Sequence, residues 1–496
     1  MPGKPRRGIS EENSRLSGKI SAMQMFDVGV IGAGSAGPKA ARTAARMGAS
    51  VVIFEESRIG GECLYTGCVP SKALLHSATL WNRILRAPEF GLPQYEGAAL
   101  DFGAVMAHAR RTIERVGAGD ATESFTRAGI VTVCERASFV DPNTVIAGAH
   151  GERYQAKQWI LCTGSRPSIP NIPGLEDAGC DTNRTVFGWT DLPRRIVVIG
   201  GGPIGCELGQ VFARFGAQVT IILSGSRILE RDDADAACVV SEMLAKDRIE
   251  LRPKTTIERV ERRGGEKVLH LRGGGEIVCD AILVAAGRRS NTEGVNLEAA
   301  GVRLAEHGRL KTDGALRTNV PHIWAAGDVA TEYKFTHAVS YEGAVTATNA
   351  VNALRGEPPI KADYHVVPRV TYTDPELASV GLTPAMARQT HGAEMIDVSR
   401  FPFDALDRAI IDGATEGFAQ IVSRHEDGAI IGAQIVGEHA GSLISEICLA
   451  MRSGLCAADI ALTMHAYPTL PEAVEAAADG AAHAPLSPNI PRAMTD

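Results

Sequence analysis

Two cysteines and a lysine lie close together in the segment GGECLYTGCVPSKALLH, residues 60–76. In a regular helix, Cys63 and Cys68 would lie about 7.5 Å apart along the axis, beyond the usual Cα separation of a disulfide, about 4.4–6.8 Å. A bridge between them therefore needs a distorted turn, and Gly67 suits such a break. Lys72 follows Cys68 by four residues, so its ammonium would lie on the same helix face and favour the nucleophilic thiolate. The segment predicts a redox-active cysteine pair.

Two other interpretations of this pair are two buried cysteines in a loop and half of a metal site. A gap of four residues is poor for zinc, and no second Cys/His pair lies close by in the sequence. We therefore predict no resident metal. The other eight of the ten cysteines are scattered along the chain, which is typical of a reducing compartment with one catalytic pair. The expected compartment is the cytoplasm.

A first dinucleotide-binding unit precedes the cysteines. Its parts are a strand (Asp27–Ile31), the glycines Gly32, Gly34 and Gly37, an alanine-rich helix (Lys39–Met47), a second strand (Ser50–Phe54) and Glu55 at its end. The glycines let the backbone approach a pyrophosphate at the helix N-terminus, and the acid can hold a ribose hydroxyl pair. A G-x-G-x-x-G pattern alone is weak, and the alternative is a set of structural turn glycines. The order of strand, helix, strand and acid favours dinucleotide binding.

A second unit of the same kind begins near residue 196. It comprises a strand (Ile196–Ile199), the glycines Gly200, Gly202 and Gly205, a helix to Phe215 and a strand (Val219–Leu223). This strand ends without an acid and continues as Ser224, Gly225, Ser226 and Arg227. Hydroxyls with an arginine can accept a 2′-phosphate. We therefore favour NADPH over NADH as the coenzyme, the alternative being that Arg227 is a solvated loop charge.

The cysteine segment together with the two glycine motifs resembles the pyridine nucleotide–disulfide oxidoreductases, which include dihydrolipoamide dehydrogenase, glutathione reductase and mercuric reductase. The resemblance extends from about Phe26 to about Ala478. It implies an α/β fold with two Rossmann-like domains, which bind FAD and NAD(P), and a C-terminal α+β dimerisation domain that forms a homodimer. The predicted divisions are an extension without order (1–24), FAD-binding parts (25–162 and 286–357), the NAD(P)-binding domain (163–285), the dimerisation domain (358–480) and a tail (481–496).

The resemblance also implies roles for individual residues. Cys68 would be the thiol beside the flavin and Cys63 the interchange thiol facing the substrate. Lys72 and Glu207 would form an ion pair beside the flavin N5, and Asp328 would bond the ribityl chain. Further positions expected at the cofactors are Ala137, Thr163, Gly164, Gly287 and Thr336. Cys162 lies where the family has a small residue, and we interpret it as a packing residue.

The segment His465-Ala466-Tyr467-Pro468-Thr469-Leu470-Pro471-Glu472 departs from the disulfide reductases. In that family the residue before this proline is a histidine that acts as acid–base catalyst across the dimer, held by a glutamate five positions on. Here Tyr467 takes the place of the histidine, while Glu472 is kept. Tyrosine, with an unperturbed pKa near 10, is a poor base at neutral pH. We therefore expect slow dithiol–disulfide interchange, unless His465 substitutes as the base.

Mercuric reductase has a tyrosine in this region as well. Its C-terminal pair of vicinal cysteines is missing from the tail Pro488–Asp496, and we also expect no N-terminal metal-binding domain. The leading hypothesis is a mercuric reductase-like enzyme that passes electrons from NAD(P)H through FAD to the cysteine pair, and on to a small-molecule or metal-ion acceptor. The alternatives are an NAD-dependent dihydrolipoamide dehydrogenase and a non-catalytic FAD-binding redox sensor.

Composition limits the partners. A chain of 496 residues is too long for one core, so several domains are expected. The net charge of −7 provides no electrostatic case for nucleic acid. No apolar run reaches the length of a membrane span, so we expect no membrane partner.

Overall fold

The computed structural model describes residues 23–120, 122–148 and 150–481. The predicted extension (1–24) and tail (481–496) therefore lie outside the described residues, except for residues 23, 24 and 481. Within the described ranges, no helix is both long and apolar enough to cross a membrane.

The first dinucleotide unit is built on a seven-stranded sheet. Its strand order is β3-β2-β1-β6-β5-β4, with β16 pairing β6. The strands are β1 (Gln24–Ile31), β2 (Val51–Phe54), β3 (Ile130–Val133), β4 (Ser138–Asp141), β5 (Thr144–Ala147), β6 (Glu152–Leu161) and β16 (Ile323–Ala325). The strands β2, β1, β6 and β16 are parallel neighbours, which is typical of a Rossmann-like sheet. Since β16 comes after the second unit in sequence, this sheet is completed by chain that returns from residue 286 onward.

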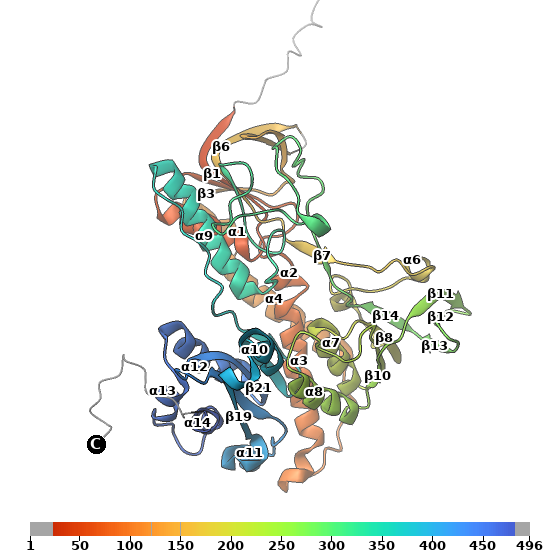
Figure 1. The fold of residues 1–496 in the computed structure, drawn as a ribbon. Coiled ribbons are helices and arrows are strands. Elements are labelled where there is room, and N and C mark those ends of the chain that lie inside the picture. The colour runs from red at the N-terminus through yellow and green to blue at the C-terminus, as the bar shows by residue number, and fades with distance from the viewer. Residues whose placement is uncertain (1–22, 121, 149, 482–496) are drawn as a thin grey trace, which may run out of the picture.

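Two helices pack together against this sheet, α1 (Ala36–Arg46) and α9 (Thr336–Arg355) (Figure 1). Their close approach needs a glycine, because a Cβ on Gly343 would lie 2.4 Å from the carbonyl oxygen of Ala36. The predicted helix Lys39–Met47 begins earlier than expected, at Ala36. The proline at position 38 then lies in its first turn, where it is tolerated.

The second unit has a four-stranded parallel sheet in the order β10-β9-β8-β14. Its strands are β8 (Arg195–Ile199), β9 (Gln218–Ile222), β10 (Glu250–Arg252) and β14 (Ala281–Val284), and its long helices are α7 (Pro203–Arg214) and α8 (Ala234–Lys246). An antiparallel sheet adjoins it, formed by β11 (Ile257–Arg263), β12 (Glu266–Leu271) and β13 (Glu276–Cys279). The chain enters and leaves this unit through a short antiparallel pair, β7 (Ser165–Pro167) and β15 (Arg288–Ser290).

The C-terminal part is a five-stranded antiparallel sheet in the order β17-β18-β21-β20-β19. Its strands are β17 (Arg369–Thr371), β18 (Glu376–Gly381), β19 (Ile396–Pro402), β20 (Phe418–Arg424) and β21 (Ile430–Gly437), and its helices are α10 (Pro384–His391), α11 (Asp407–Asp412), α12 (Ala440–Ser453), α13 (Ala457–Ala461) and α14 (Glu472–Asp479). Sheet and helices share one buried core. The predicted α/β fold with two dinucleotide units and a C-terminal α+β domain is confirmed.

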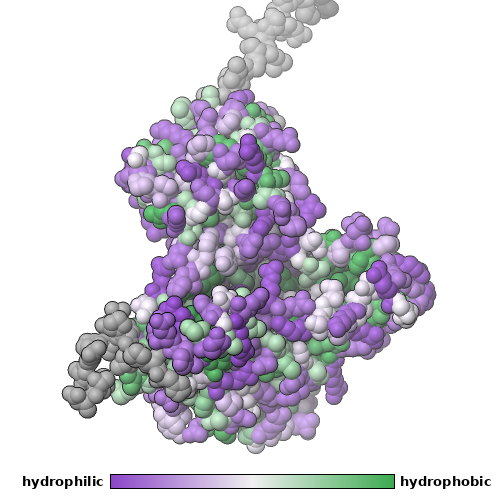
Figure 2. Space-filling model, viewed as in Figure 1, coloured by the Kyte–Doolittle hydropathy of each residue, from purple (hydrophilic) through white to green (hydrophobic). Residues whose placement is uncertain are grey.

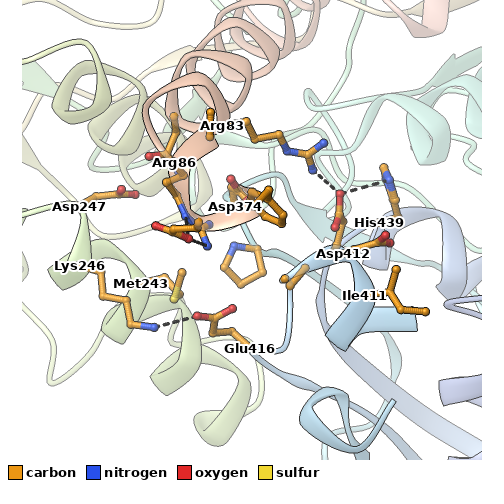
Figure 3. A pocket seen from close by; sticks show the side chains of 18 of the residues that line it. Arg83, Arg86, Met243, Lys246, Asp247, Asp374, Ile411, Asp412, Glu416 and His439 are labelled. Carbon is orange, nitrogen blue, oxygen red and sulfur yellow. Dashed lines mark hydrogen bonds and ion pairs between the residues drawn. The ribbon is translucent and has the colours of Figure 1, made fainter. Parts of the chain in front are cut away.

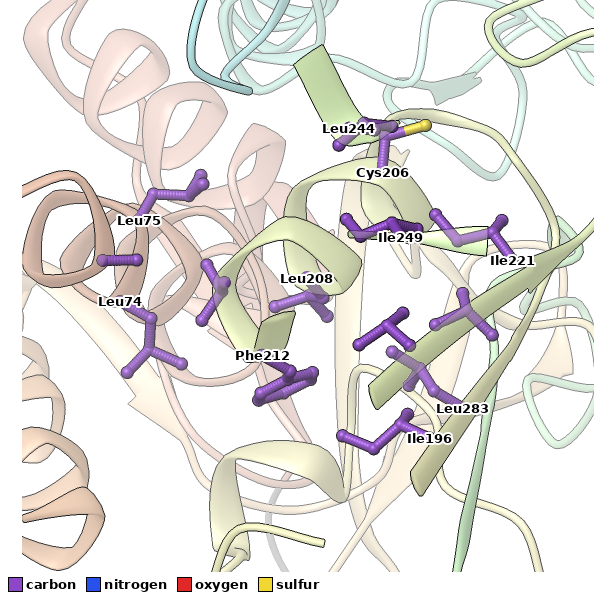
Figure 4. Close-up of a cluster of buried hydrophobic side chains, with 14 of the residues drawn as sticks. Leu74, Leu75, Ile196, Cys206, Leu208, Phe212, Ile221, Leu244, Ile249 and Leu283 are labelled. Carbon is purple, nitrogen blue, oxygen red and sulfur yellow. The ribbon is translucent and has the colours of Figure 1, made fainter. Parts of the chain in front are cut away.

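One long helix connects the three parts. The short α2 (Gly61–Tyr65) leads into α3 (Cys68–Leu85), which runs from the first unit down between the other two (Figure 1), and α4 (Phe102–Gly117) packs against it. Leu74 and Leu75 of α3 share a buried cluster with Leu208 and Phe212 of α7 (Figure 4). Each such buried side chain contributes about 1.5–3 kcal/mol relative to exposure. The packing of α3 on α7 therefore holds the start of α3 at a defined place relative to the second unit.

Candidate functional site

Of the three motif glycines in the loop after β1, one has open space beside its backbone. A Cβ on Gly32, whose φ is +100°, would lie 2.3 Å from the carbonyl oxygen of Cys162, and a Cβ on Gly37 would lie 1.9 Å from that of Gly32. Both positions therefore require glycine for the tight turn and for the contact between helix and strand. A Cβ on Gly34 would meet no atom within 4 Å, so the backbone there faces open space. This is the arrangement in which a pyrophosphate can approach the start of α1.

The loop after β8 repeats this arrangement. A Cβ on Gly200, with φ +115°, would lie 2.4 Å from the carbonyl oxygen of Ala285, and a Cβ on Gly205 would lie 2.0 Å from that of Gly200. Nothing lies within 4 Å of the same position on Gly202. The two loops thus form two matching cradles, and their backbones fit two dinucleotides.

Glu55 lies at the first loop as predicted. Its Oε2 accepts a hydrogen bond from the backbone N–H of Ala33 at 2.7 Å, and its Oε1 accepts one from Ser57 at 3.0 Å. Burial raises the pKa of this carboxyl group above its usual value. The bond to Ala33 fixes the carboxylate beside the glycine loop, where the ribose of a bound dinucleotide is expected.

The two cysteines lie on either side of a break between α2 and α3. Cys63 belongs to α2, and Cys68 is the first residue of α3. At the break, a Cβ on Gly67 would lie 2.7 Å from the carbonyl oxygen of Glu62, so the turn requires glycine. Thr336, at the start of α9, donates its hydroxyl to Cys63 Sγ at 3.1 Å and lies 3.5 Å from Cys68 Sγ. The distorted turn expected from the spacing is present, and it brings both sulfurs to one hydroxyl.

The two thiols differ in acidity. A hydrogen bond from the Cys63 thiol, the hydroxyl of Thr336 and the ammonium of Lys72 together lower the pKa of Cys68 to about 6. The same bond to Cys68, together with burial, raises the pKa of Cys63 well above its ordinary value. Cys68 is therefore the thiolate and Cys63 the thiol near neutral pH. This assignment agrees with the division of roles that the resemblance implies.

The expected ion pair next to the sulfurs is present. Lys72 Nζ lies 2.7 Å from Oε2 of Glu207, which is buried on α7. Oε1 of Glu207 accepts the backbone N–H of Tyr372 at 3.0 Å, and the lysine nitrogen lies 4.4 Å from the centre of the Tyr372 ring. Tyr372 follows β17 of the C-terminal part, so all three parts of the chain meet at this pair. Sequence reasoning missed Tyr372, because its position after a short strand does not by itself indicate a contact with this ion pair.

A polar network joins the cysteine segment to the predicted ribityl ligand, Asp328. Ser165 donates its hydroxyl to Oδ2 of Asp328 at 2.5 Å, and Nε of Arg288 donates to Ser165 Oγ at 2.7 Å. Nη2 of Arg288 also donates to Oε2 of Glu62, next to Cys63, at 2.5 Å. Glu62 pairs with Arg184 as well, and the two arginines lower its pKa against the opposing effect of burial. Sequence reasoning did not single out Glu62, Ser165 or Arg288. The available signal was the position of Glu62 directly before Cys63.

Three of the remaining cofactor positions, Thr163, Gly164 and Gly287, lie at the crossover between the two units, next to β7 and β15. Thr163 donates its hydroxyl to the carbonyl of Asn291 at 2.6 Å, and the carbonyl of Gly164 accepts the N–H of Asn291 at 2.9 Å. Gly287 has a φ of +131° and lies in the strand-end loop that follows β14. Ala137 is buried before β4, and Cys162 is buried as expected of a packing residue. These contacts hold the crossover strands together, and the roles of the residues toward a cofactor stay predictions.

The phenol of Tyr467 is not in a state to act as a base. Its side chain is exposed, and its hydroxyl donates to Oδ2 of Asp407 at 2.9 Å. This bond to a carboxylate raises the pKa of the phenol above its ordinary value, so the group is protonated at neutral pH. Glu472 does not hold the phenol; its Oε2 accepts the backbone N–H of Thr469 at 2.7 Å.

His465 is held in place by several partners. Nε2 lies 3.0 Å from Oε1 of Glu446, and Nδ1 lies 2.8 Å from the carbonyl oxygen of Thr463 and 3.3 Å from Oε2 of Glu475. Its side chain is only 7% exposed. A role as substitute base would require all of these contacts to break, and the structure therefore offers no support for it.

The guanidinium of Arg227 forms hydrogen bonds with the backbone of its own loop. Nη1 donates to the carbonyls of Ile228 and Leu229 at 3.2 and 2.7 Å, and Nη2 donates to those of Glu230 and Asp232 at 3.0 and 2.8 Å. Both terminal nitrogens of the guanidinium are thus used by the loop itself. The predicted contact of Arg227 with a 2′-phosphate would need these bonds to be given up.

A separate hollow of about 840 Å³ lies between α3, α8 and the C-terminal part (Figure 3). Ion pairs line its walls, including Lys246 with Glu416 at 2.9 Å and Arg83 with Glu438. It contains neither the two sulfurs nor the glycine loops. Within the described ranges, no group of three or more His, Cys, Asp or Glu residues could hold a metal ion.

Comparison with known families agrees with this geometry. Residues 26–352 match the model of the pyridine nucleotide-disulphide oxidoreductases, and residues 367–478 match the dimerisation domain of the same family. The chain therefore belongs to the pyridine nucleotide–disulphide oxidoreductases. It is an FAD-dependent NAD(P)H oxidoreductase that acts on sulfur groups, and its dimerisation domain supports a homodimer.

Several relatives share nearly its full length. A dihydrolipoyl dehydrogenase of Geobacillus stearothermophilus is 37% identical over 466 residues, which cover 92% of this chain and 96% of the relative. One of Bacillus subtilis is 36% identical, covering 93% and 97%. These relatives bear the name of the alternative hypothesis rather than that of mercuric reductase.

Solved structures show the same architecture. The crystal structure of LpdA from Mycobacterium tuberculosis superposes with a TM-score of 0.83 at 25% identity, covering 91% of this chain and 99% of that one. The HOCl-induced flavoprotein disulfide reductase RclA from Escherichia coli gives a TM-score of 0.82 at 24% identity, covering 92% and 99%. The latter likeness concerns the fold alone.

Proposed function

We propose that this chain is a reductase that uses NAD(P)H to convert the Cys63–Cys68 disulfide into a dithiol, which then reduces an acceptor without a histidine base. FAD, when bound on the first glycine loop, supplies the two-electron relay between the coenzyme and the disulfide. The coenzyme loses a hydride, and the disulfide gains two electrons and up to two protons. The dithiol passes the same two electrons on and closes to the disulfide again.

The residues around the sulfurs suit this cycle. The Cys63 thiol stabilises the thiolate of Cys68 most strongly, and Thr336 and Lys72 add to this effect, so that this sulfur carries negative charge near neutral pH. Cys63 keeps its proton more strongly and is the sulfur that an acceptor meets. Glu207 keeps the lysine ammonium in position.

The observation that carries the choice of acceptor is Tyr467. Its phenol is exposed, protonated and bonded to Asp407, so it can donate a hydrogen bond but does not accept a proton at neutral pH. By resemblance to the family, this position serves the sulfur pair of the other subunit in the dimer. A soft metal ion such as Hg(II) binds both sulfurs as thiolates and releases the proton of Cys63 to water, so it needs no general base at this position. A mercuric reductase-like reaction with Hg(II) as substrate therefore leads the candidates.

A dihydrolipoyl dehydrogenase is the second candidate. The identity of 37% to a protein of that name, over nearly the full length of both chains, favours it. In this reaction the cysteine pair accepts electrons from a dithiol and NAD takes them up. Loss of a positioned acid–base group typically costs a hundredfold to ten-thousandfold in rate, so we expect this activity to be slow here. We also infer a reducing compartment, by default the cytoplasm, from the scattered cysteines.

An anaerobic titration followed by an acceptor panel tests the proposal. NADH and NADPH are added to the flavin-loaded protein, and we expect bleaching of the flavin with a long-wavelength absorbance band from the Cys68 thiolate. The reduced protein is then mixed with Hg(II), glutathione disulfide and lipoamide. Reoxidation by Hg(II) at least about tenfold faster than by either disulfide is the expected result. Fast turnover of dihydrolipoamide with NAD would favour the second candidate, and no reoxidation by any acceptor would favour a redox sensor.

A further inference from the structure

The loop that follows β9 lies against the second glycine loop. The backbone N–H of Leu229 donates to the carbonyl of Gly201 at 2.9 Å, and a Cβ on Gly201 would lie 2.3 Å from Leu223. The C-terminal end of β9 is where a dinucleotide on this glycine loop places its adenosine ribose. The residues of this loop therefore decide which ribose, with or without a 2′-phosphate, fits the site.

No acidic residue ends β9, yet the carboxylate of a residue further along the loop lies against the residues that follow this strand. Oε1 of Glu230 accepts the backbone N–H of Ser226 at 3.1 Å. A Cβ on Gly225 would lie 1.7 Å from the same oxygen, so the carboxylate rests directly on the glycine backbone. The loop thus folds Glu230 back onto the residues that immediately follow the strand.

Arg227 stabilises this folded loop instead of facing outward. Its terminal nitrogens donate to four carbonyls between positions 228 and 232, including that of Glu230 at 3.0 Å. The donors of this arginine, which the sequence suggested for a 2′-phosphate, are thereby used by the backbone of the loop. The group at the strand end that can accept hydrogen bonds is then the carboxylate of Glu230.

We propose that Glu230 replaces the missing strand-end acid and makes this chain selective for NADH over NADPH. Its carboxylate accepts hydrogen bonds from the free 2′- and 3′-hydroxyls of the adenosine ribose and repels a 2′-phosphate. This inference rests on the proposed function, whose coenzyme it specifies. It reverses the preference for NADPH that the residues Ser224 to Arg227 indicate by themselves.

Two further cations lie near this loop in sequence or space. Lys254 donates its backbone N–H to the carbonyl of Gly225 at 2.8 Å, and Arg231 follows Glu230 directly. Both side chains are exposed. Lys254 contacts the backbone of Gly225 directly, and we therefore include it in the test as a cation near the loop.

The first experiment measures binding without catalysis. Isothermal titration calorimetry compares ADP-ribose with 2′-phospho-ADP-ribose on the flavin-loaded wild-type protein and on Glu230→Gln. We expect the wild-type protein to bind ADP-ribose at least about tenfold more tightly, and Glu230→Gln to reduce this ratio at least about fivefold. Glu242→Gln, an exposed carboxamide variant on α8 of the same unit, is the matched control and should keep the wild-type ratio.

The second experiment follows flavin bleaching by NADH and NADPH in a stopped-flow instrument, which requires no acceptor. The expected result is a ratio of second-order rate constants of at least about ten in favour of NADH, reduced at least about fivefold in Glu230→Gln and within about twofold of wild type in Lys254→Gln. Equal or better use of NADPH by the wild-type protein, or an unchanged ratio in Glu230→Gln, would overturn the inference. If neither coenzyme bleached the flavin, the proposed function would fail, and the calorimetry would still decide the role of Glu230.

Discussion

At the scale of single residues, the hydroxyl of Thr336 contacts the sulfurs of both cysteines. Thr336 lies within 3.5 Å of both Cys63 Sγ and Cys68 Sγ, at the N-terminus of α9 where the helix dipole also favours negative charge. The strongest influence on the acidity of Cys68 is nevertheless its hydrogen bond with Cys63. The charge is therefore assigned to one sulfur by the other, and Thr336 with Lys72 reinforces that assignment.

This arrangement predicts a measurable shift on removing the hydroxyl. Thr336→Val should raise the pKa of Cys68 from about 6 by roughly half a unit to one unit, since one hydrogen bond is worth about 1 kcal/mol. The thiolate is present above this pKa and lost below it, so the inflection moves to higher pH. The measurement is the rate of iodoacetamide alkylation of the reduced protein against pH, with mass spectrometry to identify the modified cysteine.

Thr348→Val is the control for this experiment, because Thr348 lies on the same helix and bonds only to the carbonyl of Ala344 at 2.9 Å among the described contacts. It should leave the inflection unchanged. An identical inflection in Thr336→Val and wild type would show that the hydroxyl does not act on the thiolate.

Tyr467 supports a second prediction at this scale. Tyr467→His restores an imidazole beside Asp407 and should raise the rate of dihydrolipoamide oxidation by NAD at least about tenfold, because a positioned base contributes a hundredfold or more. Tyr467→Phe removes only the hydroxyl and serves as the control. Steady-state kinetics with both variants provides the comparison. A histidine variant that keeps its flavin but gains no activity would mean that the missing base does not limit this reaction.

At the scale of elements, the side chain of Glu207 connects α7, α3 and the segment after β17. It lies buried on α7, pairs with Lys72 of α3 and accepts the N–H of Tyr372 after β17. Glu207→Ala should leave the ammonium and the N–H without this partner and lower the free energy of unfolding by about 2–3 kcal/mol, somewhat less than for a fully buried pair because Lys72 is partly exposed. Urea unfolding of the flavin-loaded protein, followed by circular dichroism, measures the change.

The exposed Glu242 on α8 provides the matched control for this prediction. Glu242→Ala should change the unfolding free energy by no more than about 0.5 kcal/mol, as is usual for surface substitutions. A similar small effect in Glu207→Ala would mean that the contact between the three elements contributes little to stability.

Elements with strong local patterns were predictable, and contacts between distant loops were not. The two glycine loops follow from spacing alone, since glycine is the only residue that fits Gly32 and Gly200 against the strands behind them. The pair Lys72–Glu207, separated by 135 positions, was accessible only through the family resemblance. The turn of Arg227 into its own backbone depends on how residues 228–232 fold, which residue types do not reveal. The same holds for the bonds from Arg288 to Glu62 and Ser165, because they form between segments more than a hundred residues apart.

At the scale of the whole molecule, the C-terminal part carries apolar side chains that a single chain leaves in solvent. Ile410 and Ile411 lie on α11, and Tyr467 bonds to Asp407 of the same helix. Met464, close by in sequence, is 95% exposed. The face visible in Figure 2 is a mixture of hydrophilic and hydrophobic residues rather than one continuous apolar surface. We expect the dimer to cover this region, because the dimerisation domain of a single chain leaves the side chain of Met464 almost fully in solvent.

The last prediction concerns this dimer. Met464→Glu should weaken self-association about tenfold or more, because burying a methionine contributes about 1.5–3 kcal/mol and a buried carboxylate would have to lose its water. Sedimentation velocity over a range of concentrations measures the dissociation constant. Met25→Glu is the control, because Met25 is also exposed, at 69%, but lies at the start of β1 in the first unit (Figure 1). NADH should still bleach the flavin of a monomeric Met464→Glu, because both glycine loops and the cysteine pair belong to one chain. A variant that stayed dimeric at wild-type concentrations would place the interface elsewhere on the domain.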